Sequence, residues 1–504
     1  MHYLLSAEEM SRLDSQASET YGVPAIVLME RAALESWRFI STLKPERLVV
    51  VAGKGNNGAD GLALARIAAI SASCQVAVVA AGCERAAADS LTALHLAGCR
   101  AIGVPVQSWS ESPAQARAIL DEADVLVDAM LGTGLAGPAR SSFHDLFHVF
   151  GNARATGTRV VSLDVPGGVR DNATSPEPAV AADYTLTFGW AKQSLYTPWG
   201  RSCAGDIHVL DIGFPKQLSS LISETAPQLV GSDDLASFLN PLPTSAHKGT
   251  RGHVLVVAGS AGLTGAARLC AEAAVRSRAG LVTLLAETIP DGLSAAVMTR
   301  FAPDLKDGFA GVSRRIDAAV IGPGWGVDAS RSATLAFLIE RLPRGVIDAD
   351  ALAALKETPC ELGDGWILTP HPAEAARLAG CDTNRVLTDT ASVGRMLADR
   401  FACTVLLKAQ TTHVCASDGR IMVVDGNVPA LGCGGSGDVL SGVIGGIMAA
   451  GECAFDAAVA GVLAHAEAGR RLYRSRGWFV ADDLPAEIAR VLAGVPESAE
   501  GSSP

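Results

Sequence analysis

A short apolar run, followed at once by a glycine-rich turn and a helix of small residues, constrains the fold of this chain most. Residues 47–53 have the composition of a buried strand, and the turn at 53–61 leads into an alanine-rich stretch. Residues 253–260 show the same pattern in the second half, although the two halves do not repeat each other in sequence. Strand, tight turn and helix in this order build a parallel sheet covered by helices. The pattern therefore predicts an α/β fold in both halves.

The length of the chain predicts more than one domain. A chain of 504 residues exceeds what one hydrophobic core usually holds. The regular pattern loosens at 214–246, where prolines interrupt it, as at a domain junction. We therefore expect a Rossmann-like three-layer α/β/α domain over residues 1–218 and a second α/β domain over residues 226–504.

Charge and cysteine usage argue against several classes of protein. The net charge of −12 disfavours a general nucleic-acid binder. The 11 cysteines are odd in number and scattered without a C-x-x-C pair, which favours reduced cytoplasmic thiols over a disulfide framework or a zinc site. The sequence has no signal peptide pattern and no apolar run of about 18 residues. We expect a soluble, cytoplasmic protein without a membrane or nucleic-acid partner.

The N-terminal residues predict a helix start. Ser6 and Glu9 match a capping box, in which the serine hydroxyl and the glutamate carboxylate each accept from a backbone N–H. Leu5 and Met10 are spaced to form the hydrophobic staple that accompanies such a start. A second helix is predicted over roughly residues 24–40.

Polar side chains gather where strands of the first half are predicted to end. The turn after the first strand carries Asn56, Asn57 and Asp60, and it matches neither the dinucleotide fingerprint nor the P-loop. Asp128 and Asp164 stand at the ends of two later strands. Each Asp alone could be a helix cap, but the ends of parallel strands share one edge, where ligands bind. The group predicts a ligand site, with amide and carboxylate oxygens that also suit a cation.

In the second half, residues 432–438 place four glycines in seven positions and end at Asp438. Backbone N–H groups in such a loop can approach an anion closely. The small, apolar stretch 439–448 predicts a buried helix whose N-terminus favours negative charge. The loop suits a transferring phosphoryl group, with Asp438 as the base that takes a proton from a hydroxyl. The alternative is a glycine-rich turn with Asp438 as an ordinary N-cap.

Other residues near strand ends can serve the same chemistry. Lys408, Thr411 and Thr412 can contact nucleotide phosphates. His371 lies between two prolines and Glu374 is close in sequence, although a lone His is more often structural. Together these residues favour phosphoryl transfer to a small molecule of the ribokinase type over a P-loop mechanism. Lys192, in the first half, can hold a charge or shuttle a proton, although alone it would more often be a solvated lysine.

Taken in order, these motifs resemble those of the bifunctional NAD(P)H-hydrate repair enzymes. The resemblance spans nearly the whole chain and rests on residues 56–61, 132–134, 164–166, 247–249, 322–324, 348–352, 369–372 and 434–438. It implies an epimerase domain fused to a nucleotide-dependent dehydratase domain with a ribokinase-like fold.

The resemblance implies two coupled activities. The N-terminal domain would interconvert the R and S epimers of hydrated NADH and NADPH (NADHX and NADPHX), as an isomerase. The C-terminal domain, a lyase, would dehydrate the S epimer with ADP and give AMP and phosphate; animal and fungal counterparts use ATP. The implied cofactors are a potassium ion in the epimerase domain and a magnesium ion with ADP. We also expect a homo-oligomer.

The resemblance also assigns roles by position. Contacts to the hydrate in the first domain fall on Asn56, Asn57, Gly58, Ala59, Asp60, Gly132, Thr133, Gly134, Leu135, Ala136, Gly137, Pro138 and Asp164. Asp164 and Lys192 would be catalytic, with Asp164 the better candidate for acid–base work, and Asn57, Asp128 and Gly167 would be the potassium positions. Contacts to the hydrate in the second domain fall on Ala266, Gly326, His371 and the catalytic Asp438. Nucleotide contacts fall on Lys408, Ala409, Gln410, Thr411, Thr412, Gly434, Gly435, Ser436 and Gly437.

Two positions depart from the family pattern. Gly167 stands where the family usually has a serine that binds potassium, so a backbone carbonyl or a water would have to replace the hydroxyl. Ala409 stands where the family often has glycine, which is a small change.

Two other functions compete with this interpretation. One is a small-alcohol kinase of the ribokinase-like class fused to a non-catalytic binding domain. The other makes the N-terminal half an interaction module. The polar set at 56–61, with Asp164 and Lys192, argues against both, since neither function needs it.

Overall fold

The computed structural model describes residues 1–71, 73–312, 315–358 and 360–494. The chain forms two compact units. The N-terminal unit comprises residues 2–227 and 387–389, and the C-terminal unit comprises residue 1, residues 228–386 and residues from 390 onward. Each unit is an α/β structure with its own principal sheet, as the sequence pattern predicts.

The sheet of the N-terminal unit has a doubly wound strand order. Its neighbouring strands run parallel in the order β4 (Val106–Ser108), β3 (Gln75–Ala80), β2 (Arg47–Ala52), β5 (Val125–Ala129), β6 (Arg159–Leu163), β7 (Tyr184–Phe188) and β9 (Asp206–Leu210). The order reverses between β2 and β5, because the chain adds β3 and β4 on one side and β6 and β7 on the other. A reversal of this kind opens a crevice at the carboxyl ends of the strands.

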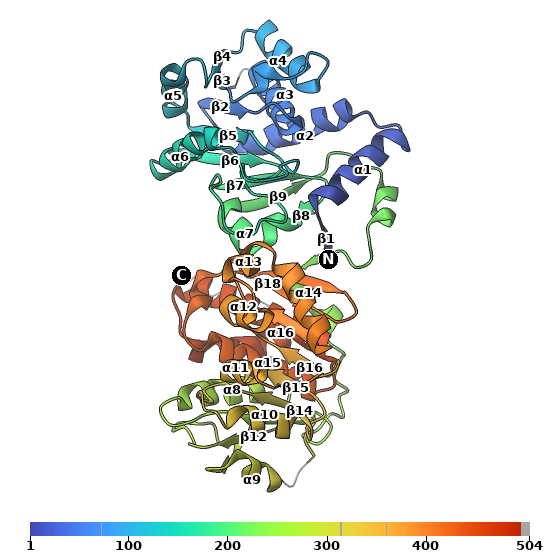
Figure 1. Ribbon diagram of the computed structural model, residues 1–504, viewed down its shortest axis with the longest axis vertical. Helices are drawn as coiled ribbons and strands as arrows, with labels where there is room; N and C mark the ends of the chain where they lie inside the picture. The colour runs from blue at the N-terminus through green and yellow to red at the C-terminus, as the bar shows by residue number, and fades with distance from the viewer. Residues whose placement is uncertain (72, 313–314, 359, 495–504) are drawn as a thin grey trace, which may run out of the picture. The chain divides into compact units, whose positions relative to one another are not determined.

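Alternate residues of the strands bury opposite faces of this sheet. Leu48, Val50 and Ala52 of β2 belong to the core under α2 (Ala25–Thr42), α3 (Asn56–Ile70) and α4 (Leu91–Ala101) (Figure 1). Val49 and Val51 point to the other core, under α5 (Pro113–Asp121) and α6 (Ser141–Ala155). The sheet is thus the middle of three layers, since a strand buried on both faces has apolar residues throughout.

Helix α1 (Ala7–Glu19) begins with the predicted capping box. The Glu9 N–H donates to Ser6 Oγ at 3.2 Å, and the Ser6 N–H donates to Glu9 Oε2 at 2.8 Å. Before it, β1 (His2–Leu5) pairs parallel to β8 (Ala191–Lys192), with Leu5 opposite Lys192. This pairing holds the start of α1 beside the chain segment that follows β7. Helix α7 (Pro198–Ala204) completes the unit.

The sheet of the C-terminal unit is larger and mostly parallel. Its order is β13 (Val297–Phe301), β12 (Leu281–Ala286), β11 (His253–Val257), β14 (Ala318–Ile321), β15 (Gly345–Ile347), β16 (Trp366–Leu368), β17 (Thr404–Leu407), β18 (Thr411–Cys415), β19 (Ile421–Asp425) and β10 (Gln228–Val230). Strand β18 runs antiparallel to both of its neighbours. The strands from β13 to β17 are parallel, so their carboxyl ends share one edge.

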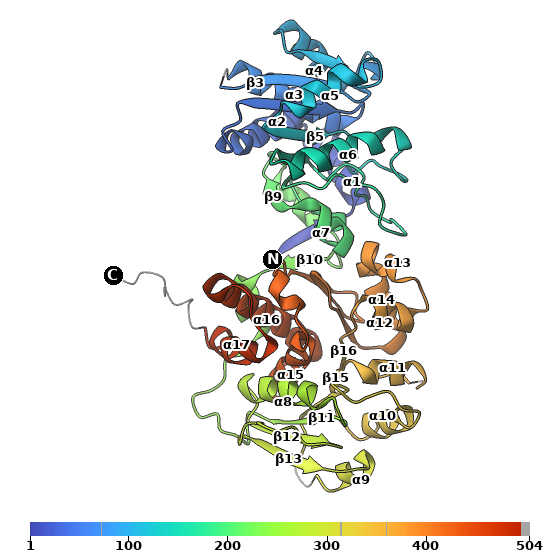
Figure 2. The ribbon, with the colours of Figure 1, turned by 90° about the vertical axis from the view of Figure 1, so that its left-hand side faces the viewer.

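Helices cover both faces of this second sheet. Figure 2 shows α8 (Thr264–Arg276), α15 (Ser436–Ala449), α16 (Ala454–Arg476) and α17 (Leu484–Leu492) on one side. On the other side are α10 (Arg331–Ile339), α11 (Asp350–Lys356), α12 (Pro372–Ala379) and α14 (Thr390–Phe401). Two short helices, α9 (Leu305–Ala310) and α13 (Thr383–Thr388), complete the set in the described residues.

Helix α15 is the buried helix that the sequence predicts. All its residues from Val439 to Ala449 are buried, and it packs against α8 so closely that a Cβ on Gly442 would lie 2.1 Å from the Cys270 carbonyl oxygen. The helix starts at Ser436, two residues before the predicted start at Asp438. Asp438 is therefore not the N-cap, and its side chain lies in the first turn.

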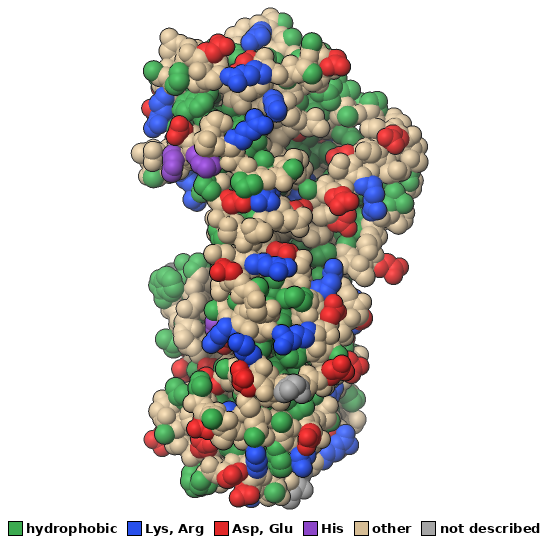
Figure 3. All heavy atoms as spheres, in the orientation of Figure 1, with side chains coloured by type: hydrophobic (Ala, Val, Ile, Leu, Met, Phe, Trp, Pro, Cys, Tyr) green, Lys and Arg blue, Asp and Glu red, His purple; other side chains and the backbone are tan. Residues whose placement is uncertain are grey.

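The surface carries charges of both signs. On the face drawn in Figure 3, Lys and Arg side chains stand singly or in small groups among acidic and apolar ones. No helix in the described part of the chain is long and apolar enough to cross a membrane.

Two candidate active sites

A cavity of about 920 Å³ opens among the loops at the carboxyl edge of the first sheet. Its size is within the range of small-molecule and cofactor sites. Eleven of the predicted residues line it: Asn56, Asn57, Asp60, Gly132, Thr133, Gly134, Leu135, Gly137, Pro138, Asp164 and Lys192. The structure therefore brings together, in one cavity, side chains that come from four different strand ends.

Asp164 and Lys192 form an ion pair inside this cavity. The Lys192 ammonium lies 2.5 Å from Asp164 Oδ1 and also donates to the Phe188 carbonyl at 2.8 Å. Lys192 is only 1% exposed, so its charge is held in place by these partners. Asp164 has a φ of 63°, a left-handed conformation that costs energy in a non-glycine residue. Such strain at the end of β6 is typical of a residue held for function.

Two more carboxylates face the same cavity. Asp60 lies in the second turn of α3, and burial raises its pKa well above the ordinary value, with Asp164 and Asp14 adding to the effect. Asp14 projects from α1, where desolvation raises its pKa to about 6; Lys192 opposes this shift and Asp164 adds to it. Sequence reasoning missed Asp14, although Ala7, Met10, Ser11 and Asp14 recur at the spacing of one helical face, and all four line the cavity.

Three of the predicted contact residues, Gly58, Ala59 and Ala136, are not among the residues that line the cavity. Gly58 and Ala59 are buried in the first turn of α3, where a Cβ on Gly58 would lie 1.9 Å from the Gly53 carbonyl oxygen. Gly58 thus allows the turn to close tightly against the end of β2. Ala136 is exposed.

The predicted potassium residues have a mixed fit to a cation. Asp128 lies within β5, not in the loop after it, and is fully buried. Its carboxylate accepts hydrogen bonds from Ser162 Oγ at 2.9 Å, the Gly167 N–H at 2.7 Å and the Met130 N–H at 3.2 Å. Burial raises the pKa of Asp128 to about 6, and these donors oppose the shift.

Of the three predicted potassium residues, Asn57 is the best suited to bind a cation. Its amide nitrogen donates to the Leu131 carbonyl at 3.0 Å, but its buried Oδ1 has no hydrogen-bond partner among the described residues. A buried acceptor without a donor costs free energy, which a cation beside it would recover. Gly167 supplies no side-chain ligand, and its carbonyl accepts from the Val180 N–H at 2.8 Å.

In the C-terminal unit, Asp348 is the centre of a second polar cluster. It lies 1% exposed at the end of β15, where one carboxylate oxygen accepts from Lys408 Nζ at 2.6 Å and the other from Ser441 Oγ at 2.5 Å. The next residue, Ala349, has a φ of 50°, and this left-handed conformation changes the direction of the backbone between β15 and α11. Asp348 lies in the 348–352 motif that contributes to the family resemblance, but it is not among the predicted site residues. It contacts two parts of the predicted site, Lys408 and α15.

Asp438 stands in the first turn of α15 beside this cluster. Burial raises its pKa to about 6; Asp348 and Asp350 add to the shift and Lys408 opposes it. Lys408 lies against the glycine loop, since a Cβ on Gly437 would be 3.3 Å from its Nζ. Burial acts to lower the pKa of Lys408, but Asp348, Glu374 and Asp438 outweigh it and raise that pKa. A carboxylate, an ammonium and helix N–H groups therefore meet at one point.

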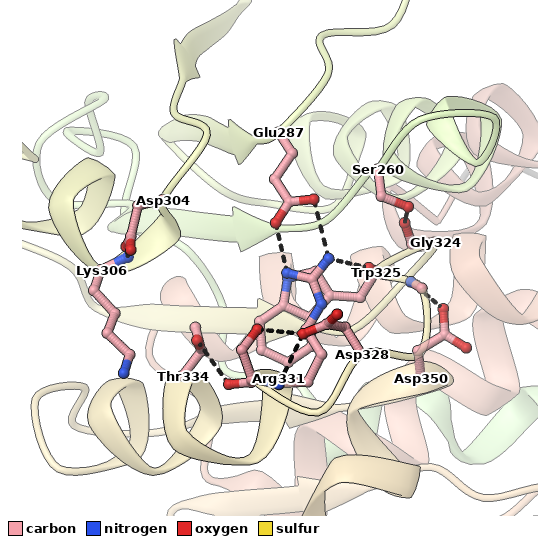
Figure 4. Close-up of polar contacts among 12 residues, drawn as sticks. Ser260, Glu287, Asp304, Lys306, Gly324, Trp325, Asp328, Arg331, Thr334 and Asp350 are labelled. Atoms are coloured by element: carbon pink, nitrogen blue, oxygen red, sulfur yellow. Dashed lines mark hydrogen bonds and ion pairs between the residues drawn. The ribbon is translucent and has the colours of Figure 1, made fainter.

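The loop after β14 approaches the same edge. The Gly326 N–H donates to Asp350 Oδ2 at 2.7 Å, and a Cβ on Gly324 would lie 3.0 Å from the Cβ of Ala266. Figure 4 shows how the loop is fixed: Arg331 makes two hydrogen bonds to Glu287, at 2.6 and 3.0 Å, and a third to the Trp325 carbonyl at 2.6 Å. The bidentate pair gives this loop a defined position.

The remaining predicted residues divide into three groups. His371 is the half-exposed N-cap of α12, and its backbone N–H donates to Glu374 Oε2 at 2.8 Å. Ala409, Gln410, Gly434, Gly435 and Ser436 lie in loops or at the start of α15 with exposed or half-exposed positions. Thr411 and Thr412, predicted to present hydroxyls to phosphate, are buried in β18, and the Thr412 hydroxyl donates to the Ala409 carbonyl. Both threonine side chains are therefore part of the sheet, because β18 folds back against β17.

Two family models match the chain, one in each unit. The model described as YjeF-related protein N-terminus matches residues 25–194, and the model described as NAD(P)H-hydrate dehydratase matches residues 254–490. The bifunctional NAD(P)H-hydrate repair enzyme Nnr of Moorella thermoacetica is 34% identical and covers 99% of this chain and 98% of its own length. The enzyme of the same name from Coxiella burnetii is also 34% identical, over 95% of this chain and 96% of its own.

Among solved structures, the C-terminal unit is similar to the ADP/ATP-dependent NAD(P)H-hydrate dehydratase of Bacillus subtilis co-crystallised with ATP/Mg²⁺. The identity is 24%, the match covers 53% of this chain and 99% of that one, and the TM-score is 0.47.

Proposed function

The chain belongs to the family of bifunctional NAD(P)H-hydrate repair enzymes, and from this premise we propose how its two sites carry out the repair. The protein is an enzyme with an epimerase domain and a dehydratase domain, and it repairs hydrated NADH and NADPH. The proposal extends to the domain limits, 1–218 and 226–504, which enclose the two matched ranges; residues 495–504 lie outside the described structure. A homo-oligomer and a cytoplasmic location stay predictions.

In the epimerase domain, the cavity of the first sheet takes the hydrated nicotinamide dinucleotide. Asn56, Asn57, Asp60 and the 132–138 loop orient it through amide, carboxyl and backbone groups. Asp164 carries out proton transfer at the hydrated ring, and its ion pair with Lys192 supports this role because the pair fixes the carboxylate and balances its charge. Two predicted positions, Gly58 and Ala59, serve the site through the backbone of the turn.

A potassium ion in this domain would be held by the unpartnered Asn57 Oδ1 and the Asp128 carboxylate, without a side-chain ligand from residue 167. When bound, it would supply positive charge near the phosphates or the carboxamide of the substrate.

In the dehydratase domain, Asp438 takes the proton from the ring hydroxyl of the S epimer. The hydroxyl oxygen then accepts the terminal phosphoryl group of ADP, and AMP is released. The N–H groups at the start of α15 and the Lys408 ammonium hold the transferring group. The C–O bond to phosphate breaks more readily than the bond to hydroxide, so phosphate leaves with the bonding pair. Loss of a proton from the neighbouring ring carbon then restores the ring double bond. Gly326, Ala266 and His371 line the approach of the hydrate.

A magnesium ion would enter this site with the nucleotide. Within the described residues, no set of three or more His, Cys, Asp and Glu side chains is arranged to hold a metal ion by itself. Asp348 is already engaged by Lys408 and Ser441, so the ion would rest mainly on ADP phosphates and water, with one or two carboxylates.

One observation carries the proposal: Asp438, Lys408 and the glycine loop meet at the carboxyl edge of a sheet that the second family model covers. The test incubates the protein with both epimers of hydrated NADH and with ADP or ATP in turn, and follows each epimer and the return of NADH absorbance. Asp438→Ala is expected to abolish the return of NADH while epimerisation continues, and Asp164→Ala is expected to do the reverse. Equal loss of both activities in either variant would contradict two separate sites.

The full-length relatives favour the repair enzyme over the rival function, a small-alcohol kinase fused to a binding domain. The relatives from Moorella thermoacetica and Coxiella burnetii match both halves of the chain, not the C-terminal half alone.

A further inference from the structure

The epimerase cavity holds more proton-carrying groups than Asp164 alone, and the chemistry of the proposed function calls for two. Hydration of a dihydronicotinamide puts the hydroxyl on the carbon next to the ring nitrogen, because an enamine takes a proton at its β-carbon and water at its α-carbon. Epimerising that carbon breaks one C–O bond and forms another on the opposite face of the ring. The leaving oxygen must gain a proton and the attacking water must lose one. Inverting glycosidases meet the same demand with two carboxyl groups on opposite faces.

Helix α1 supplies a carboxyl group to the cavity from an element separate from the strand ends. Asp164 and Lys192 lie at the strand ends, whereas Asp14 lies on the face of α1 that lines the cavity with Ala7, Met10 and Ser11. Asp14 lines the cavity yet keeps contact with solvent. A carboxyl group in this position can exchange its proton between turnovers.

The position of α1 is fixed relative to Lys192. Leu5 pairs with Lys192 in the β1–β8 ladder, and α1 begins two residues later. The Ala7 N–H donates to Asp171 Oδ2 at 2.5 Å, and the Gln193 side chain donates to the Leu4 carbonyl at 3.2 Å. With a rise of 1.5 Å per residue, Asp14 lies about 10 Å along the helix from Ala7. Asp14 remains near enough to the strand ends for the charges of Lys192 and Asp164 to act on its pKa.

We propose that Asp14 is the second proton-transfer residue of the epimerase site and acts on the face of the ring opposite to Asp164. In one direction, protonated Asp14 gives its proton to the hydroxyl as the C–O bond breaks, and the bonding pair leaves with the oxygen as water. The nitrogen lone pair forms a ring iminium ion. A water molecule then attacks the other face, and Asp164 takes its proton. In the other direction the two residues exchange roles, so a proton passes between them in each turnover.

Asp60 has a different role in the same group. Burial raises the pKa of Asp60 well above its ordinary value, and Asp164 and Asp14 add to the effect, so its environment favours the protonated form, which can donate a hydrogen bond. The pKa of Asp14 is raised to about 6, so it gains and loses its proton near neutral pH. The charged groups that face Asp14 are Asp60, Asp164 and Lys192, and the cavity also carries Lys54, Arg85 and Arg140. Asp14 thus combines a pKa near neutral pH with a position on a different element, α1, from Asp164 and Lys192.

The test compares Asp14→Asn and Asp14→Glu with Glu19→Gln, which removes an exposed carboxylate at the end of the same helix. The rate of R-to-S conversion is measured on the full chain without nucleotide, against the uncatalysed rate. Asp14→Asn is expected to lower kcat at least about 100-fold and to change KM by less than about 3-fold. Asp14→Glu should recover at least about tenfold of that loss, and Glu19→Gln should match the wild type.

The pH profile separates catalysis from a merely structural role. The active form of the pair holds one proton, so wild-type kcat/KM should fall as pH rises through about 6, where Asp14 ionises in the free enzyme. This alkaline limb should be lost in Asp14→Asn.

The inference is overturned if Asp14→Asn retains kcat within about 3-fold of the wild type, if the whole loss is in KM, or if the alkaline limb persists. If Asp14→Asn does not fold, Asp14→Glu decides: a displaced limb supports the inference, and full kcat with an unmoved limb contradicts it. A wild-type protein that does not epimerise the hydrate would contradict the proposed function, not the role of Asp14.

Discussion

Asp438 combines the two properties that a general base in a phosphoryl-transfer site needs. It lies in the first turn of α15, near the N–H groups that would hold the phosphoryl group, and its pKa is raised to about 6. A carboxylate with an ordinary pKa would be a weaker base, whereas this one is stronger and still ionised at neutral pH. Burial and the neighbouring Asp348 thus raise the pKa of Asp438 in the direction that the proposed base role requires.

The dehydratase reaction should therefore lose activity on the acid side. The base acts when ionised, and protonation of Asp438 in the free enzyme begins as pH falls toward 6, so kcat/KM should fall on that side. We expect kcat/KM for the S epimer with ADP to be about tenfold lower at a pH one unit below the midpoint than on the plateau. Initial rates of NADH return, measured across this range with the uncatalysed rate subtracted, check the prediction.

The matched variant for this profile is Asp438→Asn. Its residual activity should lose the acid limb, because the titrating group is gone. A limb that persists at the same midpoint in the variant would assign the titration to another group, such as Glu374, whose pKa burial also raises.

Single glycines set the geometry of the turn that carries Asn56 and Asn57. A Cβ at Gly58 would be 1.9 Å from the Gly53 carbonyl oxygen, so the strand end and the first turn of α3 cannot both keep their places. We expect Gly58→Ala to destabilise the N-terminal unit by about 1–3 kcal/mol, since overpacking forces the backbone to shift. Thermal unfolding monitored through loss of epimerase activity and through circular dichroism measures the effect.

Gly151→Ala is the control in the same unit, and its sign should be opposite. Gly151 lies in α6 with open space where a Cβ would stand, so alanine should stabilise the helix by about 0.5–1 kcal/mol. Destabilisation by both substitutions, or by neither, would show that close approach at Gly58 does not limit the turn.

At the level of elements, the sequence predicts correctly those features that are specified by residues close together in the chain. The strand predicted at 47–53 is β2 (Arg47–Ala52), and the capping box at Ser6 and Glu9 starts α1, because strand, turn and cap are each specified by neighbouring residues. The glycine loop and the buried helix α15 are also predictable from the sequence, because the loop is followed directly by the small, apolar residues of the helix. These features need no knowledge of the tertiary fold.

Features that depend on distant pairing were missed. Asp14 reaches the cavity because β1 pairs with β8, almost two hundred residues later in the chain. No local sequence pattern predicts that pairing. Thr411 and Thr412 look like polar loop residues, but the antiparallel turn into β18 buries them. Asp128 lies inside the strand predicted at 125–129, but its burial among donors from Ser162 and Gly167 depends on tertiary packing. The order of strands and polar residues in the sequence predicts that the site lies at the carboxyl edge of the sheet. Tertiary packing determines which side chains face that edge.

On the scale of the whole molecule, the residues of the two candidate sites lie in separate units. Every residue that lines the cavity of about 920 Å³ lies in the N-terminal unit. Asp348, Lys408 and Asp438 all lie in the C-terminal unit. Each site therefore has its own side chains, and loss of one should leave the chemistry of the other intact.

This separation predicts that two inactive halves complement each other in trans. With a mixture of R and S epimers and ADP, Asp438→Ala alone should return no NADH. Asp164→Ala alone should return NADH from the S epimer and then slow to the rate of uncatalysed epimerisation. An equimolar mixture of the two variants should convert both epimers completely, because the hydrate can leave one protein and enter another. The full time course of both epimers, followed chromatographically beside the wild type, measures this. If the mixture ran no faster after the S epimer was spent than Asp164→Ala alone, the two sites would have to act on one substrate within a single chain.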